Sequence, residues 1–325
     1  MRWIQAWEAR VKMPPAMPSW LLKATAQGAI SPLPGRDRLN YLLQKHLTGS
    51  MVLTEERFES KVEQCRRHVD NYRAARSSAG LPALALELGT GWYPIVPVGL
   101  ALAGVERVVT IDVSPLLDLG RTREVLERYA SQLRSGTLRL PEIAADRAQA
   151  VIAAARDPSP RDAPELLARL GIRVIVGDAR TSGLPSGSVE LLLSNNTLEH
   201  IPPEVLRGLM TEFARLAAPG AVMDHLVDMS DHYAHFDPSI TEFNYLRYSH
   251  RTWRIFNNRL QYQNRLRLSD YRRLLEGAGF TPVAEEDERG APEELRTVKL
   301  APPFRRYAFE DLLVLRSWVT AIAPP

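Results

Sequence analysis

The sequence has one cysteine, few lysines and no long apolar run. Because Cys65 is the only cysteine in 325 residues, no disulfide can form within the chain, which fits a reducing compartment. No stretch approaches the roughly 18 apolar residues that a membrane span needs. Residues 1–7 lack the apolar core of a secretory signal. We therefore expect a cytoplasmic chain without a membrane span.

The sequence also lacks an excess of one charge. Its 41 basic residues are nearly balanced by 38 acidic ones, for a formal net charge of +3, and the two signs are interspersed. Lysine occurs only at positions 12, 23, 45, 61 and 299, so arginine carries nearly all the positive charge. With no basic stripe and no recognisable RNA-binding motif, we expect no nucleic-acid partner. The hydrophobic content of 45% suffices for a sizeable core.

What the sequence does contain is the pattern of a strand, a tight turn and a helix between residues 84 and 105. The apolar run 84–88 breaks into a turn at Gly89 and Gly91, and the apolar segment 94–105 has the length of a helix. Glycine can adopt positive φ and leaves space for a ligand close to the backbone. The pattern therefore predicts an α/β domain with a ligand loop at this turn.

A second short strand, 108–111, ends at Asp112, which lies 25 residues after Glu87 (112 − 87). In open α/β sheets ligands bind at the carboxyl ends of the strands, and a carboxylate there can accept hydrogen bonds from two ribose hydroxyls. A dinucleotide is less favoured, because its fingerprint needs a third glycine where this chain has Pro94. The two strands together predict a nucleoside site.

Four motifs in this order resemble those of the class I S-adenosylmethionine-dependent methyltransferases of the type 11 kind. They are Glu87-x-Gly89-x-Gly91, the strand-terminal Asp112, the segment Val174–Ala179, and the segment Leu191–Ile201 with its Leu-Glu-His-Ile ending. The resemblance covers roughly residues 80 to 290. It implies a Rossmann-like α/β fold with a seven-stranded sheet, mostly parallel with the last strand antiparallel, under an N-terminal helical cover.

The segment 1–80 is expected to form an N-terminal arm and a helical cover. Helices are predicted over 36–47 and 54–76, and in the family such helices commonly cover the cofactor pocket. The tryptophan-rich arm before them could rest on a membrane surface, or fold over the domain or over a second subunit. A homodimer is one possible assembly.

The methyltransferase domain is expected to span 81–325. Nearly sixty residues separate Asp112 from the third strand, which predicts an insertion over 115–170. The polar and aromatic segment 228–268 is predicted to form a lid. The last strand is predicted over 312–319, as the antiparallel strand that closes the sheet in the family.

The residues expected to bind S-adenosylmethionine follow the strand ends. Asp178 can accept a hydrogen bond from the adenine amine, a role that the resemblance implies, and the amides of Asn195 and Asn196 can bind the methionine tail. The full set of predicted cofactor residues is Glu87, Gly89, Thr90, Gly91, Asp112, Val113, Asp178, Ala179, Asn195 and Asn196.

The segment 224–237 packs three histidines and four aspartates into fourteen residues after the fifth strand. His232 or His235, oriented by Asp228 or Asp231, could act as a general base near neutral pH. A divalent metal is a second interpretation, but no pair repeats the His-x3-His spacing of a helical zinc site, so no metal ligand is predicted. Capping and salt-bridging loop residues are a third interpretation.

His200 of the Leu-Glu-His-Ile motif is a further base candidate, since the resemblance implies that it lies near the transferred methyl group. Aromatic, amide and arginine side chains between 243 and 265 suit a polar or ring-bearing acceptor such as a sugar. We therefore expect an S-adenosylmethionine-dependent methyltransferase that acts on a small molecule or glycan, in secondary-metabolite or polysaccharide biosynthesis, with a hydroxyl acceptor first and an amine next. The alternatives are an enzyme that uses the cofactor for other chemistry, such as cyclisation, and a non-catalytic protein that binds adenosyl ligands.

Overall fold

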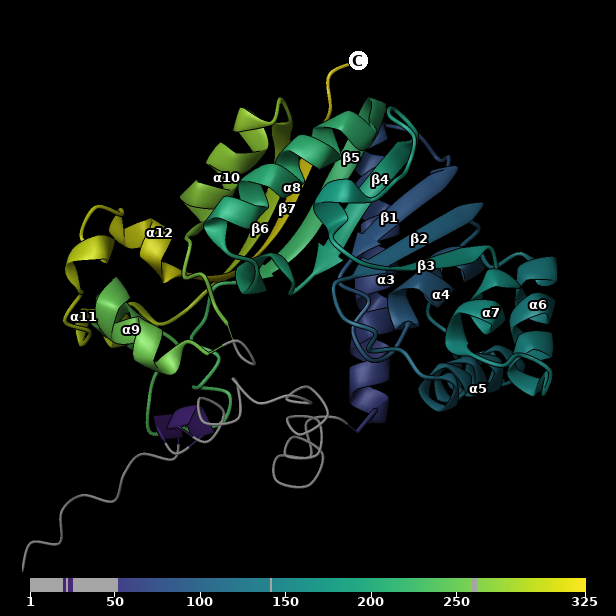
Figure 1. Cartoon of the computed structure of the whole chain (residues 1–325), viewed down its shortest axis with the longest axis horizontal. Helices are drawn as coiled ribbons and strands as arrows, with labels where there is room; N and C mark the ends of the chain where they lie inside the picture. The colour runs from purple at the N-terminus through teal and green to yellow at the C-terminus, as the bar shows by residue number, and fades with distance from the viewer. Residues whose placement is uncertain (1–19, 22, 26–51, 141, 259–261) are drawn as a thin grey trace, which may run out of the picture.

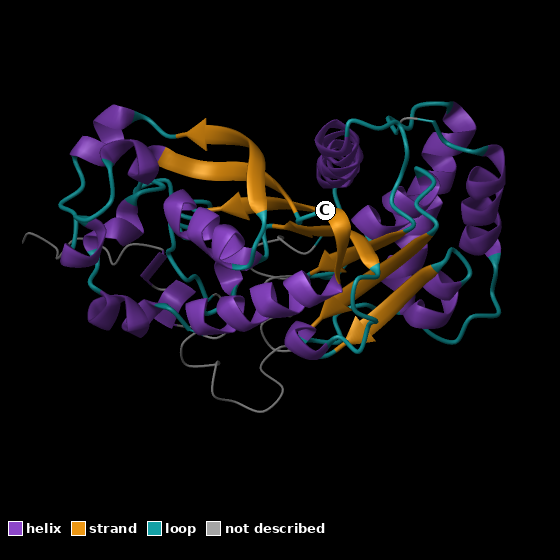
Figure 2. Ribbon diagram, turned by 90° about the horizontal axis from the view of Figure 1, so that it is seen from above, coloured by secondary structure: helices purple, strands orange, loops and turns teal. Residues whose placement is uncertain are grey.

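The structure is a computed structural model that describes residues 20, 21, 23–25, 52–140, 142–258 and 262–325. The helix expected over 36–47 and most of the N-terminal arm lie outside the described residues. A seven-stranded twisted sheet forms the centre, and helices pack on both of its faces (Figures 1 and 2). No helix in the described part of the chain is both long and apolar enough to cross a membrane.

The sheet has the strand order β3-β2-β1-β4-β5-β7-β6. The strands are β1 Leu84–Leu88, β2 Arg107–Asp112, β3 Ile172–Val176, β4 Val189–Asn195, β5 Ala217–Asp228, β6 Thr281–Arg289 and β7 Val314–Ile322. Strands β1 to β5 pair in parallel, and β7 enters antiparallel between β5 and β6. This confirms the predicted fold class, including the single antiparallel strand at the end of the chain.

Two hydrophobic clusters bury the two faces of the sheet. Helices α3 Glu55–Arg76, α4 Ile95–Leu102, α5 Leu119–Ser135, α6 Ala145–Arg156 and α7 Ala163–Ala168 contribute to the first cluster. Helices α8 Pro203–Leu216 and α10 Leu268–Gly277 contribute to the second. The segment predicted as an insertion, 115–170, therefore supplies three helices of the first face, α5, α6 and α7.

A third hydrophobic cluster lies at the β6 end of the sheet. Helices α9 His250–Phe256, α11 Pro292–Arg296 and α12 Phe309–Leu313 meet there. Trp20 of the N-terminal arm is buried among them, 5.5 Å from the ring of Tyr233 and 5.2 Å from that of Phe256, centroid to centroid. At Trp20 the arm thus lies over the segment that follows β5.

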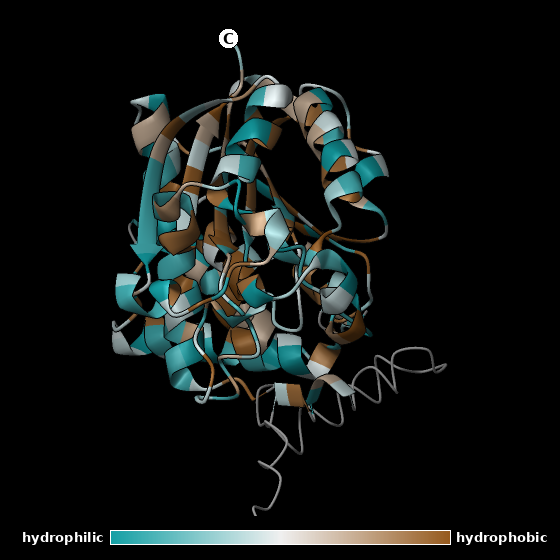
Figure 3. Cartoon of the chain, turned by 90° about the vertical axis from the view of Figure 1, so that its left-hand side faces the viewer, coloured by the Kyte–Doolittle hydropathy of each residue, from teal (hydrophilic) through white to brown (hydrophobic). Residues whose placement is uncertain are grey.

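The edge strand β6 is longer than the sequence predicts. The residues 280–284, from Phe280 to Ala284, predict a strand of that length from the sequence, whereas β6 continues through the charged residues 285–289 and pairs with β7 to its end. Charged residues have low strand propensity, but an edge strand exposes them to solvent, where they also discourage pairing with other chains. The hydrophilic colour of this strand is visible at the margin of the molecule (Figure 3).

Helix α3 covers the first face as the sequence predicts for 54–76. Thr54 caps its N-terminus by accepting a hydrogen bond from the amide of Arg57 at 3.2 Å. Its apolar side chains, Phe58 and Cys65 among them, recur at helical spacing and pack against α4. This packing holds α3 beside the carboxyl ends of the strands.

Gly99→Ala should weaken the contact between α3 and α4. A Cβ at position 99 would lie 2.7 Å from Cys65 Sγ and 2.8 Å from the Tyr129 hydroxyl, inside a core with no room to yield. We expect a loss of about 1–3 kcal/mol in the free energy of unfolding, measured by urea titration. Gly277→Ala is the control, because nothing lies within 4 Å of the added Cβ there. Equal midpoints for the two variants would contradict the prediction.

Candidate active site

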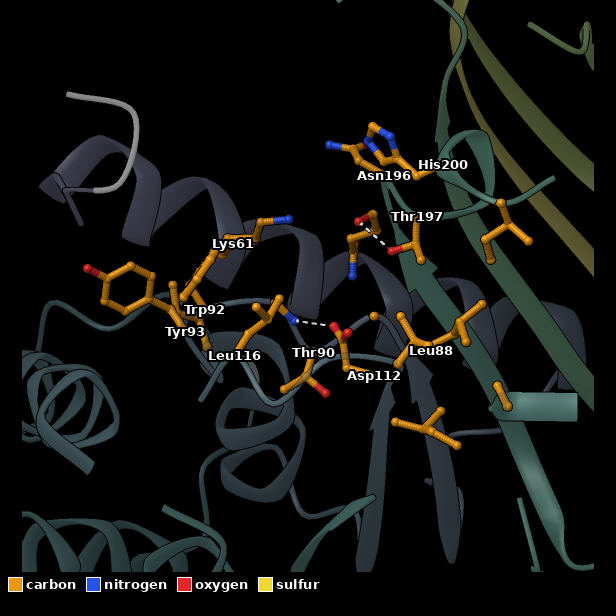
Figure 4. Close-up of a pocket in the computed structure, with 18 of the residues that line it drawn as sticks. Lys61, Leu88, Thr90, Trp92, Tyr93, Asp112, Leu116, Asn196, Thr197 and His200 are labelled. Carbon is orange, nitrogen blue, oxygen red and sulfur yellow. Dashed lines mark hydrogen bonds between the residues drawn. The ribbon is translucent and has the colours of Figure 1, made fainter. Parts of the chain in front are cut away.

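A cavity of about 1260 Å³ opens at the carboxyl ends of the parallel strands, with α3 along one side (Figure 4). It is larger than the roughly 300–1,000 Å³ of a site for one small molecule, so it has room for a nucleoside and a second molecule. The described residues that line it include Lys61, Gly89, Thr90, Gly91, Asp112, Val113, Asp178, Ala179, Asn195, Asn196 and His200. All the predicted cofactor residues except Glu87 therefore meet at one cavity.

The glycine turn after β1 has the backbone that its sequence requires. Gly89 has φ +86° and Gly91 has φ +65°, both in the left-handed region that side chains disfavour. A Cβ at Gly89 would lie 2.7 Å from Cγ2 of Thr197, so this glycine also lets β4 approach. Nothing lies within 4 Å of the corresponding position at Gly91. The backbone at Gly91 is thus open to a ligand in the cavity.

Asp112 ends β2 and faces this turn (Figure 4). One carboxylate oxygen accepts from the amide of Gly91 at 3.1 Å and the other from the amide of Ser114 at 3.0 Å. A carboxylate has about four acceptor positions, so it keeps two for the hydroxyls of a ribose. Val113 is 78% exposed beside it and offers an apolar surface to the base that such a ribose carries.

Glu87 lies below the glycine turn and not on the cavity surface. It pairs with Thr110 across β1 and β2, so the two side chains share a face, and the Thr110 hydroxyl donates to its carboxylate at 2.7 Å. Burial raises the pKa of Glu87 to about 7. The Thr90 hydroxyl bonds to that of Thr110, so Glu87 supports the shape of the turn through Thr110.

Asp178 stands at the cavity edge but is already paired. It caps the short 3-10 helix η2, Ala179–Thr181, and accepts from the backbone amide of Arg180 at 2.9 Å and from its Nε at 3.0 Å. These bonds lower the pKa of the Asp178 carboxyl. An adenine amine would have to share this carboxylate with Arg180.

Asn195 and Asn196 present unsatisfied amide atoms at the end of β4. Asn195 Nδ2 and Asn196 Oδ1 are buried and have no hydrogen-bond partner in the described part of the chain. Asn196 also has a positive φ of 51°. Buried polar atoms without partners are rare and are commonly completed by a bound molecule. One donor and one acceptor match the carboxylate and amine of a methionine tail.

A buried network behind Asn195 was not predicted from the sequence. His68 of α3 bonds through Nε2 to Asn195 Oδ1 at 3.1 Å and through Nδ1 to Asp224 of β5 at 2.6 Å. Asp224 also accepts from the Thr320 hydroxyl at 2.7 Å. From the sequence alone, His68 would be taken as a packing or surface residue, and the helical spacing of Phe58 and the later apolar residues places it on the buried face. This network fixes the orientation of the Asn195 amide.

Lys61 is a second residue that the sequence analysis did not select. It extends from α3 into the cavity, and its amine bonds to Gln64 at 2.9 Å (Figure 4). Burial lowers the pKa of Lys61, while the carboxylates of Glu87 and Glu199 oppose that shift. Lysine on the exposed side of a covering helix has no distinctive sequence signal, since only the packing of α3 directs it inward.

His200 is the only one of the five predicted catalytic residues that lines the cavity. Its Nδ1 lies 2.7 Å from the carbonyl oxygen of Tyr262, which can only accept, so Nδ1 carries the proton in the neutral ring. Its Nε2 then holds a free lone pair and has no hydrogen-bond partner among the described residues. Desolvation by the surrounding chain lowers the pKa of His200, although the residue remains accessible from the cavity.

The other four predicted catalytic residues lie behind His200 or point elsewhere. The His232 ring is 5.0 Å from that of His200, and its Nε2 lies 3.8 Å from Asp228 Oδ1. His235 instead approaches Arg316, 3.2 Å from its Nη2, and Asp231 is buried and caps a turn at Tyr233. Only Asp228 is thus placed to orient His232, and His235 and Asp231 do not face the cavity.

Glu199 completes a cluster with the two nearest imidazoles. One oxygen of Glu199 and one ring nitrogen each of His200 and His232 lie within 4.8 Å of one another. Both Glu199 oxygens are buried without a side-chain hydrogen-bond donor among the described residues, and burial raises the pKa of the carboxyl well above its ordinary value, although the backbone amides of Glu199 and Asp228 oppose that rise. Glu199 belongs to the Leu-Glu-His-Ile motif, but the sequence alone indicates no role for it.

Comparison with known proteins finds one family model and several solved structures. A family model described as a methyltransferase domain matches residues 117–223. No curated protein matches the chain. One similar structure is the 1,6-didemethyltoxoflavin N1-methyltransferase of Burkholderia thailandensis, solved with its substrate and S-adenosylhomocysteine, at 15% identity and a TM-score of 0.45, covering 97% of this chain and 94% of that one. Another is an S-adenosylmethionine-dependent methyltransferase of Methanosarcina mazei, at 13% identity and a TM-score of 0.39, covering 74% and 92%.

The strand order and the cavity at the strand ends are those expected of the class I methyltransferase fold, and the methyltransferase-domain model matches residues 117–223 of the chain. The cofactor that the sequence predicts for this fold is S-adenosylmethionine. The residues present fit that molecule, because Gly91 leaves space at the turn, Asp112 keeps free acceptor positions, and Asn195 has a buried amide without a partner.

Proposed function

We propose that this methyltransferase methylates a hydroxyl group of a small molecule or glycan, with an amine as the next choice of acceptor. The observation that carries the proposal is the imidazole of His200, which lines the cavity with its Nδ1 bonded to the Tyr262 carbonyl, so that Nε2 is the nitrogen left to accept a proton. A hydroxyl acceptor must lose its proton during the reaction, and a neutral imidazole at the cavity wall can accept it. Methylation of a hydroxyl thus requires a base such as His200, whereas an acceptor that loses no proton would not require one.

Each end of the cofactor has residues to hold it. We assign the ribose to Asp112, the base to the surface beside Val113 and Asp178, and the methionine tail to Asn195 and Asn196. When bound, S-adenosylmethionine supplies a methyl group already activated by its sulfonium. The chain then has to align the acceptor with the methyl group and exclude water, and this alignment supplies much of the rate.

The acceptor is assigned to the part of the cavity near His200, since the cavity exceeds the volume of one ligand. The described residues of the predicted lid, 228–268, do not line the cavity. Tyr262 and Asn264 of that segment instead hold the turn that carries His200. The lid role and a place in secondary-metabolite or polysaccharide biosynthesis stay predictions.

The experiment is a methylation screen with S-adenosylmethionine labelled on the methyl group, with sugars and glycosides first and amines second. We expect label in an ether of a hydroxylated acceptor, identified by mass spectrometry. Label found only in N-methyl products would move the assignment to the amine. Consumption of the cofactor with a cyclised or otherwise unmethylated product would overturn methyl transfer, and tight adenosyl binding with no turnover would indicate a binding protein.

A further inference from the structure

The cluster of Glu199, His200 and His232 has the composition of a divalent metal site. Two imidazoles and one carboxylate form a ligand set that binds zinc and other first-row divalent ions with positions left for further ligands. Their ligand atoms lie within 4.8 Å of one another. Around a tetrahedral zinc ion with bonds of about 2.0–2.1 Å, ligand atoms lie roughly 3.4 Å apart. Small side-chain movements would therefore close the set around an ion.

The members of the cluster lack the protein partners that would otherwise satisfy them. Glu199 is 1% exposed, and no side chain in the described part of the chain donates a hydrogen bond to its oxygens; the backbone amides of Glu199 and Asp228 only oppose the rise in its pKa that burial causes. His232 Nε2 is likewise buried without a partner there. Burying a carboxylate without a partner is costly, and an ion is one of the few ways to satisfy it.

The surroundings hold the ligands in place. Nδ1 of His200 is bonded to the Tyr262 carbonyl, the arrangement by which metal-binding histidines are usually oriented. Asn264 donates to the carbonyls of Leu198 and Ile201 at 2.8 and 2.9 Å, and so fixes the turn η3, Leu198–His200. The first two ligands thus come from a turn that is pinned from outside.

The nearby charges leave the position between the ligands free. Asp228 lies beside His232, but its oxygens accept from Ser230 and from Arg316. The amine of Lys61 influences Glu199 only through its charge and bonds to Gln64. The side chains of Lys61 and Arg316 do not hydrogen-bond to Glu199.

We propose that Glu199, His200 and His232 together bind one divalent transition-metal ion at the wall of the cavity. The role given to the ion rests on the proposed function, because the acceptor hydroxyl has to reach His200. A metal-bound hydroxyl loses its proton more readily, so the acceptor oxygen would be held on the ion while its proton passes to solvent. With the ion bound, the lone pair of His200 would hold the ion, so the direct proton acceptance proposed above for His200 applies to the metal-free chain.

The test is metal binding by the purified full chain after treatment with a chelator. We expect titration calorimetry with Zn²⁺ to give one ion per chain, and Co²⁺ to give a visible absorption band of a site with nitrogen and oxygen ligands. Glu199→Gln and His232→Asn should each weaken Zn²⁺ binding by at least about 100-fold, the upper range for loss of a group that only orients a metal ligand, because each of these residues is a ligand itself. His250→Asn is the matched control, because His250 is exposed and bonds to Arg265.

Binding of S-adenosylhomocysteine serves as the control for folding, because neither Glu199 nor His232 lines the cavity. A wild-type chain that binds S-adenosylhomocysteine but takes up no Zn²⁺ or Co²⁺ would overturn the metal site. So would a Glu199→Gln variant with wild-type Zn²⁺ affinity, or methyl transfer at full rate by the chelated enzyme. Those results leave methyl transfer with His200 as the base intact. Failure to methylate any acceptor with metal bound would instead count against the proposed function alone.

Discussion

Asp112→Ala should abolish the binding of S-adenosylmethionine at micromolar concentrations. The substitution removes the carboxylate at the end of β2 that we assign to both ribose hydroxyls. Hydrogen bonds to a charged group contribute about 1.5–3 kcal/mol each, so losing two should weaken binding by about 100-fold or more. Titration calorimetry of both chains with S-adenosylmethionine and S-adenosylhomocysteine measures the difference.

Asp112 also bonds to the amides of Gly91 and Ser114, so the loss of affinity could come from a distorted turn. A ligand without the ribose hydroxyls separates the two causes. Wild type should bind the dideoxy analogue of S-adenosylhomocysteine much more weakly than the parent, whereas Asp112→Ala should bind the two alike. Asp146→Ala removes an exposed carboxylate far from the cavity and should bind as wild type does. Unchanged affinity in Asp112→Ala would refute the ribose assignment.

His200→Gln should lower kcat for methyl transfer by about 100- to 10,000-fold, the range found when a positioned acid or base is removed. The glutamine amide keeps polarity at the cavity wall but has no lone pair basic enough to take a proton or bind a transition metal. We assign the cofactor to other residues, so the affinity for S-adenosylhomocysteine should stay within about threefold. Steady-state kinetics with an acceptor from the screen, beside titration calorimetry, measures both quantities.

A matched control for this substitution is His250→Gln, which removes an imidazole that does not line the cavity. It should leave kcat unchanged. If His200→Gln retained kcat within about threefold, His200 would have no part in the chemical step. If it instead lost affinity for S-adenosylhomocysteine to the same extent as kcat, His200 would be a cofactor residue.

Three residues with unusual environments lie at the cavity or next to it. Asn195 and Glu199 each carry a buried polar atom without a partner in the described residues, and His200 has an oriented and unprotonated nitrogen. Each of these features carries a cost in stability when nothing is bound. Their grouping is what a site that binds charged and polar ligands requires.

The sequence by itself determined the sheet and the edge of the sheet at which the candidate site lies. Apolar runs of strand length set β1 to β5, and the turn residues between them set the direction of the chain, so Gly89, Asp112 and Asn195 had to meet at one sheet edge. These features depend on local periodicity and on backbone conformation, which a few neighbouring residues decide. The antiparallel β7 followed from the family resemblance and is confirmed.

Only the tertiary structure decided which polar side chains face the cavity. The sequence grouped His232, His235 and Asp231 equally, but packing against Arg316 and around Tyr233 turns two of them away. Glu87 faces Thr110 because of strand pairing, and His68 reaches Asn195 only because α3 packs across β4 and β5. The direction of a side chain depends on contacts between residues far apart in the chain. Those contacts cannot be predicted from residue type alone.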